Sequence, residues 1–301
     1  MSDQINVFDR RLLSWRRSRA ASSASRHDFL LARVAQDLAE RVAIVNRRFD
    51  VAVDLGAHHG LVGTRLRELD NVGLVIEADG CPALLAQCAG PRVLADEELL
   101  PFADASLDLV VSGLALQHVN DLPGTLAQIR RALKPDGLLL ASVLGGHTLA
   151  ELRAAWLAAE AEVEGGASPR VAPQLEMRAL GALLQRAGLA LVVTDAETVT
   201  VSYPSALALM RDIKAMGASN TLTARKRRPT RRETLMRACE IYEQSHADST
   251  GRVIATFEIL TATGWAPDAS HPKPLAPGSA RARLADALGS REHSVTGEPD
   301  E

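Results

Sequence analysis

The chain has 301 residues with 47% hydrophobic content, enough for an enzyme-sized core that needs no metal or disulfide to hold it. Its formal net charge of -3 gives no reason to expect nucleic-acid binding, which requires a concentrated positive surface. Three cysteines, an odd number without metal-site spacing, argue against a disulfide framework and favour a reducing compartment. No apolar run reaches the roughly 18 residues that a transmembrane helix needs. We therefore expect a cytoplasmic protein with at most peripheral membrane contact.

The N-terminal residues 1–45 are predicted to form a helical cap. Residues 10–26 are rich in Arg, Ser and Ala, like a mitochondrial transit peptide, but acids precede them at Asp3 and Asp9, so we interpret the segment as part of the folded protein. An amphipathic helix is expected from Asp28 to Val45 and should cover one edge of a sheet. The apolar residues that recur there at helical spacing are Phe29, Leu30, Val34, Leu38 and Val42.

A candidate ligand-binding loop follows an apolar run at residues 51–60. The run ends in Asp54-Leu-Gly56-Ala57-His58-His-Gly60, which is typical of a buried strand that turns into a nucleotide-binding loop. The usual spacing is Asp-x-Gly-x-Gly-x-Gly, because glycine takes positive φ and lets the backbone approach a ligand. His58 stands where the middle glycine is expected, so its side chain should crowd a ligand unless the backbone shifts.

Two acidic positions lie at the distances that a nucleotide site in an α/β domain requires. Asp79 ends the apolar run 72–79, 25 residues after Asp54, where a carboxylate can accept both ribose hydroxyls; Glu77 is the competing candidate. Asp96 follows the short predicted strand 92–94 and is placed to bind an adenine amino group, with Glu97 as a second contact. Either acid alone is more typical of a helix cap or a turn, and only their joint spacing favours a site.

The whole pattern predicts an α/β fold with a doubly wound, mostly parallel sheet. Five strands near residues 51, 74, 93, 107 and 138 alternate with helices after His59, Pro82 and Leu122. The run 106–112 opens into a loop that contains Leu114, at the strand end where such sheets bind ligands. Two last strands, 189–194 and 255–265, should add an antiparallel edge and complete a domain over residues 46–265.

Two segments outside this sheet have separate predictions. Residues 198–252 are expected to form a helical insertion that lies over the strand ends as a substrate lid. Within it, residues 225–232 contain six basic side chains, which are either a solvated loop or a docking surface for an acidic protein face, anionic lipid or phosphate. Residues 266–301 are rich in Pro and Gly and are expected to form a flexible tail, with one short helix near 281–288.

Several motifs together resemble the class I methyltransferases that depend on S-adenosylmethionine (SAM), and in particular the respiratory complex I assembly factors that include a mitochondrial protein-arginine hydroxylase. The match extends over most of the chain. A malonyl-carrier-protein methyltransferase is the nearest alternative relative. The segments that carry the resemblance are Val7-Phe-Asp-Arg-Arg-Leu12, Leu94-Ala-Asp-Glu-Glu-Leu-Leu-Pro-Phe102, Leu107-Asp-Leu-Val-Val-Ser112, Val119-Asn-Asp-Leu-Pro123, Leu133-Lys-Pro-Asp-Gly137, Gly145-Gly-His-Thr-Leu-Ala-Glu-Leu-Arg153 and Met216-Gly-Ala-Ser-Asn220.

This resemblance implies a SAM site and a protein substrate, for which a subunit of complex I is the candidate. The cofactor-binding residues would be Asp54, Gly56, Ala57, His58, Gly60, Asp79, Asp96, Glu97 and Leu114. His118 is the candidate general base, because histidine titrates in the required range. The candidates for the substrate side are Phe8, Trp15, Gln117, His147 and Tyr203, each of which could equally be a packing residue.

Three functions remain open at this point. The first is SAM-dependent methylation of a protein subunit, the second is arginine hydroxylation on the same fold, and the third is a non-catalytic assembly chaperone with a degraded SAM loop. Hydroxylation by non-haem iron would require two histidines and a carboxylate. The loop histidines 58, 59, 118 and 147 do not form a recognisable ligand pattern, so we predict no metal site.

Overall fold

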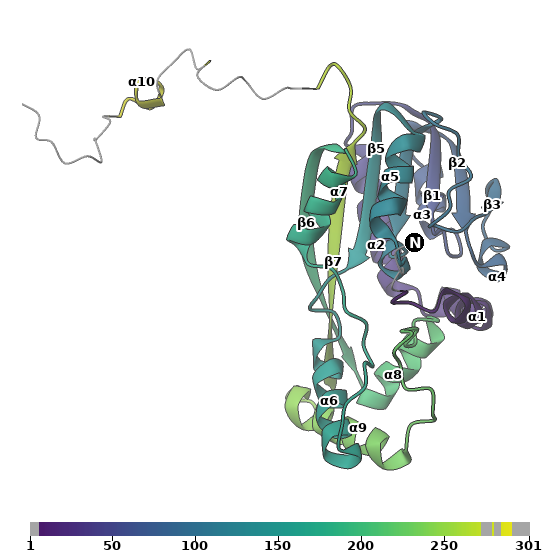
Figure 1. Ribbon diagram of the computed structural model, residues 1–301, viewed down its shortest axis with the longest axis vertical. Coiled ribbons are helices and arrows are strands. Elements are labelled where there is room, and N and C mark those ends of the chain that lie inside the picture. The colour runs from purple at the N-terminus through teal and green to yellow at the C-terminus, as the bar shows by residue number, and fades with distance from the viewer. Residues whose placement is uncertain (1–5, 272–278, 280–283, 291–301) are drawn as a thin grey trace, which may run out of the picture. The chain divides into compact units, whose positions relative to one another are not determined.

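A seven-stranded sheet organises the protein (Figure 1). The computed structural model describes residues 6–271, 279 and 284–290. The strand order is β3-β2-β1-β4-β5-β7-β6, in which β1 to β5 are parallel to one another and β7 is antiparallel to both of its neighbours. The strands are β1 Phe49–Leu55, β2 Val72–Asp79, β3 Arg92–Leu94, β4 Leu107–Gly113, β5 Leu133–Leu144, β6 Ala190–Tyr203 and β7 Val253–Trp265. The predicted doubly wound α/β fold is confirmed.

Helices cover both faces of the sheet, because successive side chains of each strand point in opposite directions. Leu138 and Leu140 of β5 join the core on the side of α2, whereas Leu139 and Ala141 join the core on the side of α5. The helices in the described residues are α1 Arg10–Ala20, α2 Phe29–Ala43, α3 Leu61–Arg67, α4 Pro82–Leu85, α5 Leu122–Ala132, α6 Ala150–Glu164, α7 Met177–Arg186, α8 Ala206–Ala215, α9 Arg232–His246 and α10 Leu284–Leu288, with short 3₁₀ turns η1 Ala21–Arg26 and η2 Leu116–His118.

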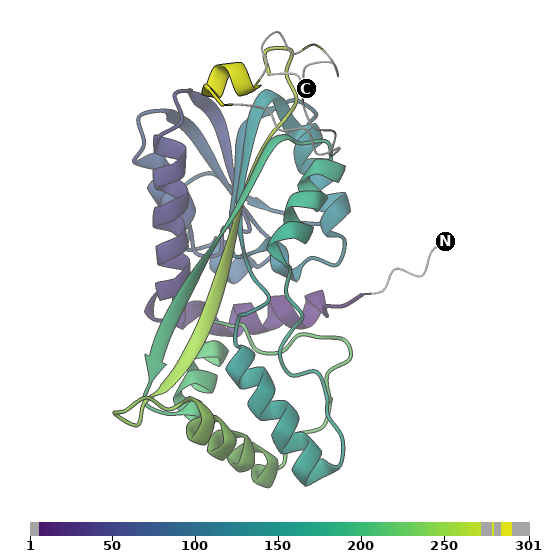
Figure 2. The ribbon, with the colours of Figure 1, turned by 90° about the vertical axis from the view of Figure 1, so that its left-hand side faces the viewer.

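The antiparallel edge is longer than the sequence predicts. β6 continues to Tyr203, so the insertion begins at Pro204 and not at residue 198. β5 pairs with β7 only over residues 259–265, whereas β6 pairs with β7 as far as Val253. The two strands therefore run on together beyond the sheet as a ribbon toward α6, α8 and α9, which form a separate helical layer (Figure 2).

The two ends of the chain differ. The predicted helix from Asp28 to Val45 is α2, and a second helix, α1, precedes it within the segment 1–45 that was predicted as a helical cap without bounds for this helix. Residues 268–301 form a separate unit from residues 1–267. In that unit the structure describes the short helix α10 within the predicted segment 281–288, and most of the predicted flexible tail lies outside the described residues. No described helix is long and apolar enough to cross a membrane.

Candidate active site

The loop between β1 and α3 keeps the backbone that a glycine-rich loop would have. Gly56 and Gly60 have φ angles of +71° and +87°, and His58 has a φ angle of 55°. His58 therefore occupies the left-handed region that glycine adopts freely and other residues adopt at a cost. Its ring lies edge-on to the ring of His59, with 5.0 Å between the centroids. The loop therefore has the backbone conformation of a glycine-rich loop, with His58 in the left-handed conformation that glycine would adopt without strain.

Three buried carboxylates lie under this loop, and only one is suited to hold a ligand. Asp79 accepts hydrogen bonds from the backbone N–H of His58 at 2.9 Å and of Cys81 at 2.7 Å, which fixes it at the end of β2. Glu77 is instead engaged by Arg67 at 3.1 Å and by the Gly90 N–H at 2.7 Å. This geometry favours Asp79 over Glu77 as the residue next to a ribose.

Asp54 at the end of β1 supports the loop from below. Its Oδ2 accepts a hydrogen bond from the Gly63 N–H at 2.8 Å, which ties β1 to the start of α3, while its Oδ1 has no partner among the described residues. Burial raises the pKa of Asp54 to about 8, and the nearby Glu77 and Asp79 act in the same direction. The same cause, burial, raises the pKa of Asp79.

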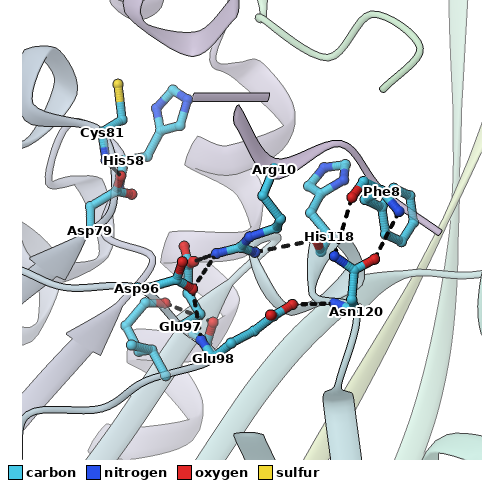
Figure 3. A network of polar contacts seen from close by, with 12 residues as sticks. Phe8, Arg10, His58, Asp79, Cys81, Asp96, Glu97, Glu98, His118 and Asn120 are labelled. Atoms are coloured by element: carbon cyan, nitrogen blue, oxygen red, sulfur yellow. Dashed lines mark hydrogen bonds and ion pairs between the residues drawn. The ribbon is translucent and has the colours of Figure 1, made fainter. Parts of the chain in front are cut away.

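The acidic turn after β3 is held by an arginine from α1 (Figure 3). The Arg10 guanidinium donates to Asp96 Oδ1 at 2.6 Å, to Glu97 Oε2, and to the His118 carbonyl at 3.2 Å. The Asp96 side chain is 53% exposed and the Glu97 side chain 4%. No described residue donates to Asp96 Oδ2, which leaves this oxygen available to an adenine amino group.

The segment before α1 links this turn to the helical layer. The Phe8 N–H donates to Asn120 Oδ1 at 2.8 Å, and the Asn120 side chain donates back to the Phe8 carbonyl at 3.2 Å. The Asp9 N–H donates to the Thr221 carbonyl at 2.8 Å. Residues 7–10 therefore connect the loop after β4, the acidic turn and the loop after α8.

Two adjacent cavities lie where these segments meet. The larger has a volume of about 210 Å³ and reaches from the loop after β1 to the helical layer; among its lining residues are Phe8, Gly56, His58, Leu114, Gln117, His118 and Gln174. The smaller has a volume of about 60 Å³ between α1 and the acidic turn, and is lined by Arg10, Leu13, Ser14, Arg17, Gly80, Cys81, Asp96 and Glu97. Leu13 and Arg17 line both, so α1 forms the wall that the two cavities share.

Three residues that line the larger cavity each have a buried polar atom without a hydrogen-bond partner among the described residues, namely Gln117 Oε1, His118 Nδ1 and Gln174 Oε1. Burial lowers the pKa of His118 to about 3, and the positive charges of Arg17 and Arg10 contribute. A ring that resists protonation so strongly stays neutral and is not an effective base near neutral pH, and its Nδ1 accepts a hydrogen bond only in the tautomer that carries the proton on Nε2. The role of general base expected for His118 is therefore not supported.

Other residues expected on the substrate side lie away from the cavity. Trp15 is 54% exposed on the outer face of α1, beneath Arg19. His147 is exposed, and its N–H donates to Glu258 at 2.9 Å. Tyr203 is buried at the end of β6 and donates its hydroxyl to Asp212 at 2.8 Å. Of the five residues expected on the substrate side, only Phe8 and Gln117 line the cavity. Residue type alone therefore did not predict which side chains reach it.

Sequence reasoning missed Arg10, Arg17 and Gln174. The two arginines belong to the positions 10, 13, 14 and 17, which share one face of a helix, so helical spacing in the N-terminal segment was the available signal. Gln174 lies in a coil region and gave no signal. Among the described residues, no three His, Cys, Asp or Glu side chains are arranged to hold a metal ion.

The basic loop is only partly neutralised. Arg225 pairs with Asp9 at 3.1 Å, and Lys226 pairs with Glu164. The remaining four, Arg227, Arg228, Arg231 and Arg232, are exposed, and none forms an ion pair with a residue that the structure describes.

Comparison with known proteins agrees with this geometry. Residues 53–141 match the family model described as a methyltransferase domain. The chain is 38% identical over 292 residues to the mitochondrial arginine hydroxylase NDUFAF5 of Danio rerio, an alignment that covers 94% of this chain and 89% of the relative. The chain belongs to the NDUFAF5 family. The human NDUFAF5 is also 38% identical, over 92% of this chain and 81% of the relative.

The chain is also similar to proteins outside the NDUFAF5 family. The chain is 32% identical to a malonyl-[acyl-carrier protein] O-methyltransferase of Gallionella capsiferriformans, over 87% of this chain and 92% of the relative. Among solved structures, the YcgJ protein of a Bacillus species matches with a TM-score of 0.55 at 14% identity, covering 78% of this chain and 98% of that one. This structural likeness shows a shared fold, which the family model over residues 53–141 identifies as that of a methyltransferase domain.

The residues of the site suit SAM, the cofactor of this family of methyltransferase folds. The small cavity adjoins the unpartnered oxygen of Asp96, which is where an adenine amino group would be recognised. Asp79 is fully buried and lines neither cavity, but it is hydrogen-bonded to the backbone of His58 and Cys81, which line the larger and the smaller cavity, and each of its oxygens has a second lone pair for a ribose hydroxyl. When bound, SAM supplies an electrophilic methyl group; the protein supplies its orientation.

Proposed function

We propose that this protein binds SAM at the carboxyl ends of β1, β2 and β4 and modifies an arginine side chain of a protein partner. The observation that carries the substrate assignment is the acceptor-rich wall of the larger cavity. A guanidinium group has five N–H donors and no acceptor, so the two unpaired glutamine oxygens, together with His118 Nδ1 in the tautomer that carries its proton on Nε2, are its chemical complement. A buried acceptor left unpaired costs about 1–3 kcal/mol, which a donor-rich substrate would recover.

Hydroxylation is the first candidate for the reaction, because the most similar relatives reported above are named arginine hydroxylases. It would require dioxygen as the oxidant, with one oxygen atom inserted into the substrate C–H bond and the other reduced to water by a two-electron co-substrate. Methyl transfer is the second candidate, and the similarity to malonyl-[acyl-carrier protein] O-methyltransferases favours it. The partner that we propose is a subunit of respiratory complex I, on the basis of the motifs at residues 145–153 and 216–220. Three free cysteines support a cytoplasmic location.

The unpaired arginines of the basic loop support a protein partner with an acidic surface. Arg227 and Arg228 follow the segment 216–221, which lines the larger cavity, after five intervening residues. A partner whose acidic residues flank the target arginine would be steered toward the cavity mouth by their charge. Weak peripheral contact with anionic lipid is the alternative use of the same loop.

The test is mass spectrometry of complex I subunits from cells with and without the gene. An arginine that carries an added oxygen atom only when the gene is present supports hydroxylation, and an added methylene unit supports methyl transfer. Complementation with Gln174→Leu, which removes one acceptor and keeps the volume of the side chain, should lower the modified fraction. If every arginine has the same mass in both strains while complex I still fails to assemble without the gene, a non-catalytic chaperone is the correct description.

A further inference from the structure

The two arginines of α1 that line the site differ in whether their guanidinium groups have partners. The Arg10 guanidinium is saturated by two carboxylates and a carbonyl. Arg17, two helical turns later on the same face, forms no hydrogen bond or ion pair through its side chain with any residue that the structure describes. Its charge nevertheless acts on the site: it adds to the lowering of the pKa that burial causes for His58 and His118, and it opposes the rise of the pKa that burial causes for Asp79.

The position of Arg17 is specific. Its side chain lines both cavities, so it lies where the nucleoside part of the site meets the part that reaches the loop of Gly56 and His58. A ligand with an adenine near Asp96 and a ribose near Asp79 would carry its remaining atoms past this point. A cation that lines a binding site without an anionic partner is suited to an anion that the ligand itself supplies.

The rest of the site is unfavourable for a carboxylate. Asp79, Asp96 and Glu97 lie beside the loop and the acidic turn, and Arg10 pairs only with the last two. The only anionic group of SAM is the carboxylate of its methionine part. Without a dedicated cation, this carboxylate would be repelled by the acids that hold the ribose and the adenine.

We propose that Arg17 binds the methionine carboxylate of SAM, which makes α1 a cofactor-binding element outside the recognised methyltransferase domain. This inference rests on the cofactor assignment of the proposed function. It also predicts an order of binding. An unneutralised Arg17 on the wall of the larger cavity repels a substrate guanidinium, so the cofactor enters first and its carboxylate removes that repulsion.

Isothermal titration of the full-length chain tests the proposal with two ligands that differ only in the carboxylate, SAM and decarboxylated SAM. Arg17→Ala should weaken SAM binding about tenfold or more, the effect of losing one charge-assisted hydrogen bond, and leave the affinity for decarboxylated SAM unchanged. Arg17→Lys should retain part of the preference for SAM. The matched control is Arg19→Ala, which removes an exposed arginine of the same helix and should change neither affinity.

Each alternative outcome has a distinct meaning. Equal weakening of both ligands by Arg17→Ala would overturn the proposal, because it would show that Arg17 shapes the pocket without contacting the carboxylate. Equal affinities of the unmodified protein for the two ligands would overturn it as well. Failure of the unmodified protein to bind either ligand would reject the SAM site together with the role of Arg17, whereas the arginine modification is measured separately by mass spectrometry.

Discussion

Arg10→Ala should destabilise the N-terminal segment far more than removal of an exposed arginine does. The Glu97 side chain is 4% exposed, and Arg10 is the cation that compensates its charge. Breaking a fully buried pair costs about 3–5 kcal/mol because a charge is left without a partner. Since the Arg10 side chain is 20% exposed and water can partly replace it, we expect a loss of about 2–3 kcal/mol.

Native-state hydrogen exchange of the amides of α1 and of residues 95–98 is the suitable assay, since α1 can open without global unfolding. The expected loss corresponds to exchange about thirtyfold faster or more, because 1.4 kcal/mol is a factor of ten. Arg33→Ala is the control: Arg33 pairs with Glu197, both side chains are about half exposed, and its removal should change the exchange rates little, because water replaces the lost contact. Adding Glu97→Gln to Arg10→Ala should restore part of the protection. Equal effects of Arg10→Ala and Arg33→Ala would refute the reasoning.

Three further substitutions test the loop and the cavity wall. Gly56→Ala should lower the free energy of unfolding by about 2–4 kcal/mol and abolish SAM binding, because the new Cβ would lie 2.1 Å from the Ala115 Cβ at a φ angle of +71°; normal thermal unfolding and SAM titration would contradict this. His58→Gly should tighten SAM binding, since it removes a side chain from the cavity wall and relieves a left-handed residue; unchanged affinity would show that the histidine is harmless. His118→Gln should flatten the acid limb of the stability curve. The folded-state pKa of about 3 lies below the unfolded value of 6.5, so the unfolded state binds more protons as the pH falls from 6.5 to 3, and the native protein loses up to about 1.4 kcal/mol per pH unit in this window. The free energy of unfolding is measured by urea unfolding at several pH values for both proteins. The same dependence of this free energy on pH in both would contradict the burial of a neutral ring.

The parallel part of the fold was predictable because buried strands are apolar runs bounded by turns. The antiparallel edge of the sheet, formed by β6 and β7, was less predictable. β6 has one solvent-facing side, and its polar residues Asp195 and Glu197 interrupt the apolar pattern although the strand continues through them. β6 is hydrogen-bonded to β7 along this stretch, and this pairing cannot be predicted from the local sequence. The pairing with β7 therefore determines where β6 ends.

The site divides in the same way. Asp79 and Asp96 follow strands at fixed spacing, so the topology of the sheet brings them to one edge and their placement could be predicted. Arg10 and Arg17 reach that edge from a helix at the start of the chain, and only the folded structure shows that α1 lies across the strand ends. Trp15 belongs to the same helix but faces solvent, which shows that the rotation of α1, and not residue type, determines which side chains enter the site.

The most direct test of the account is titration of SAM into the purified full-length protein, with S-adenosylhomocysteine in parallel. Binding with a micromolar dissociation constant, weakened in Asp79→Asn, is the result that the account predicts, because the loop keeps its glycine-like backbone despite His58. If neither ligand binds to the folded protein, the account is contradicted. The remaining description is then a methyltransferase fold that acts as an assembly chaperone.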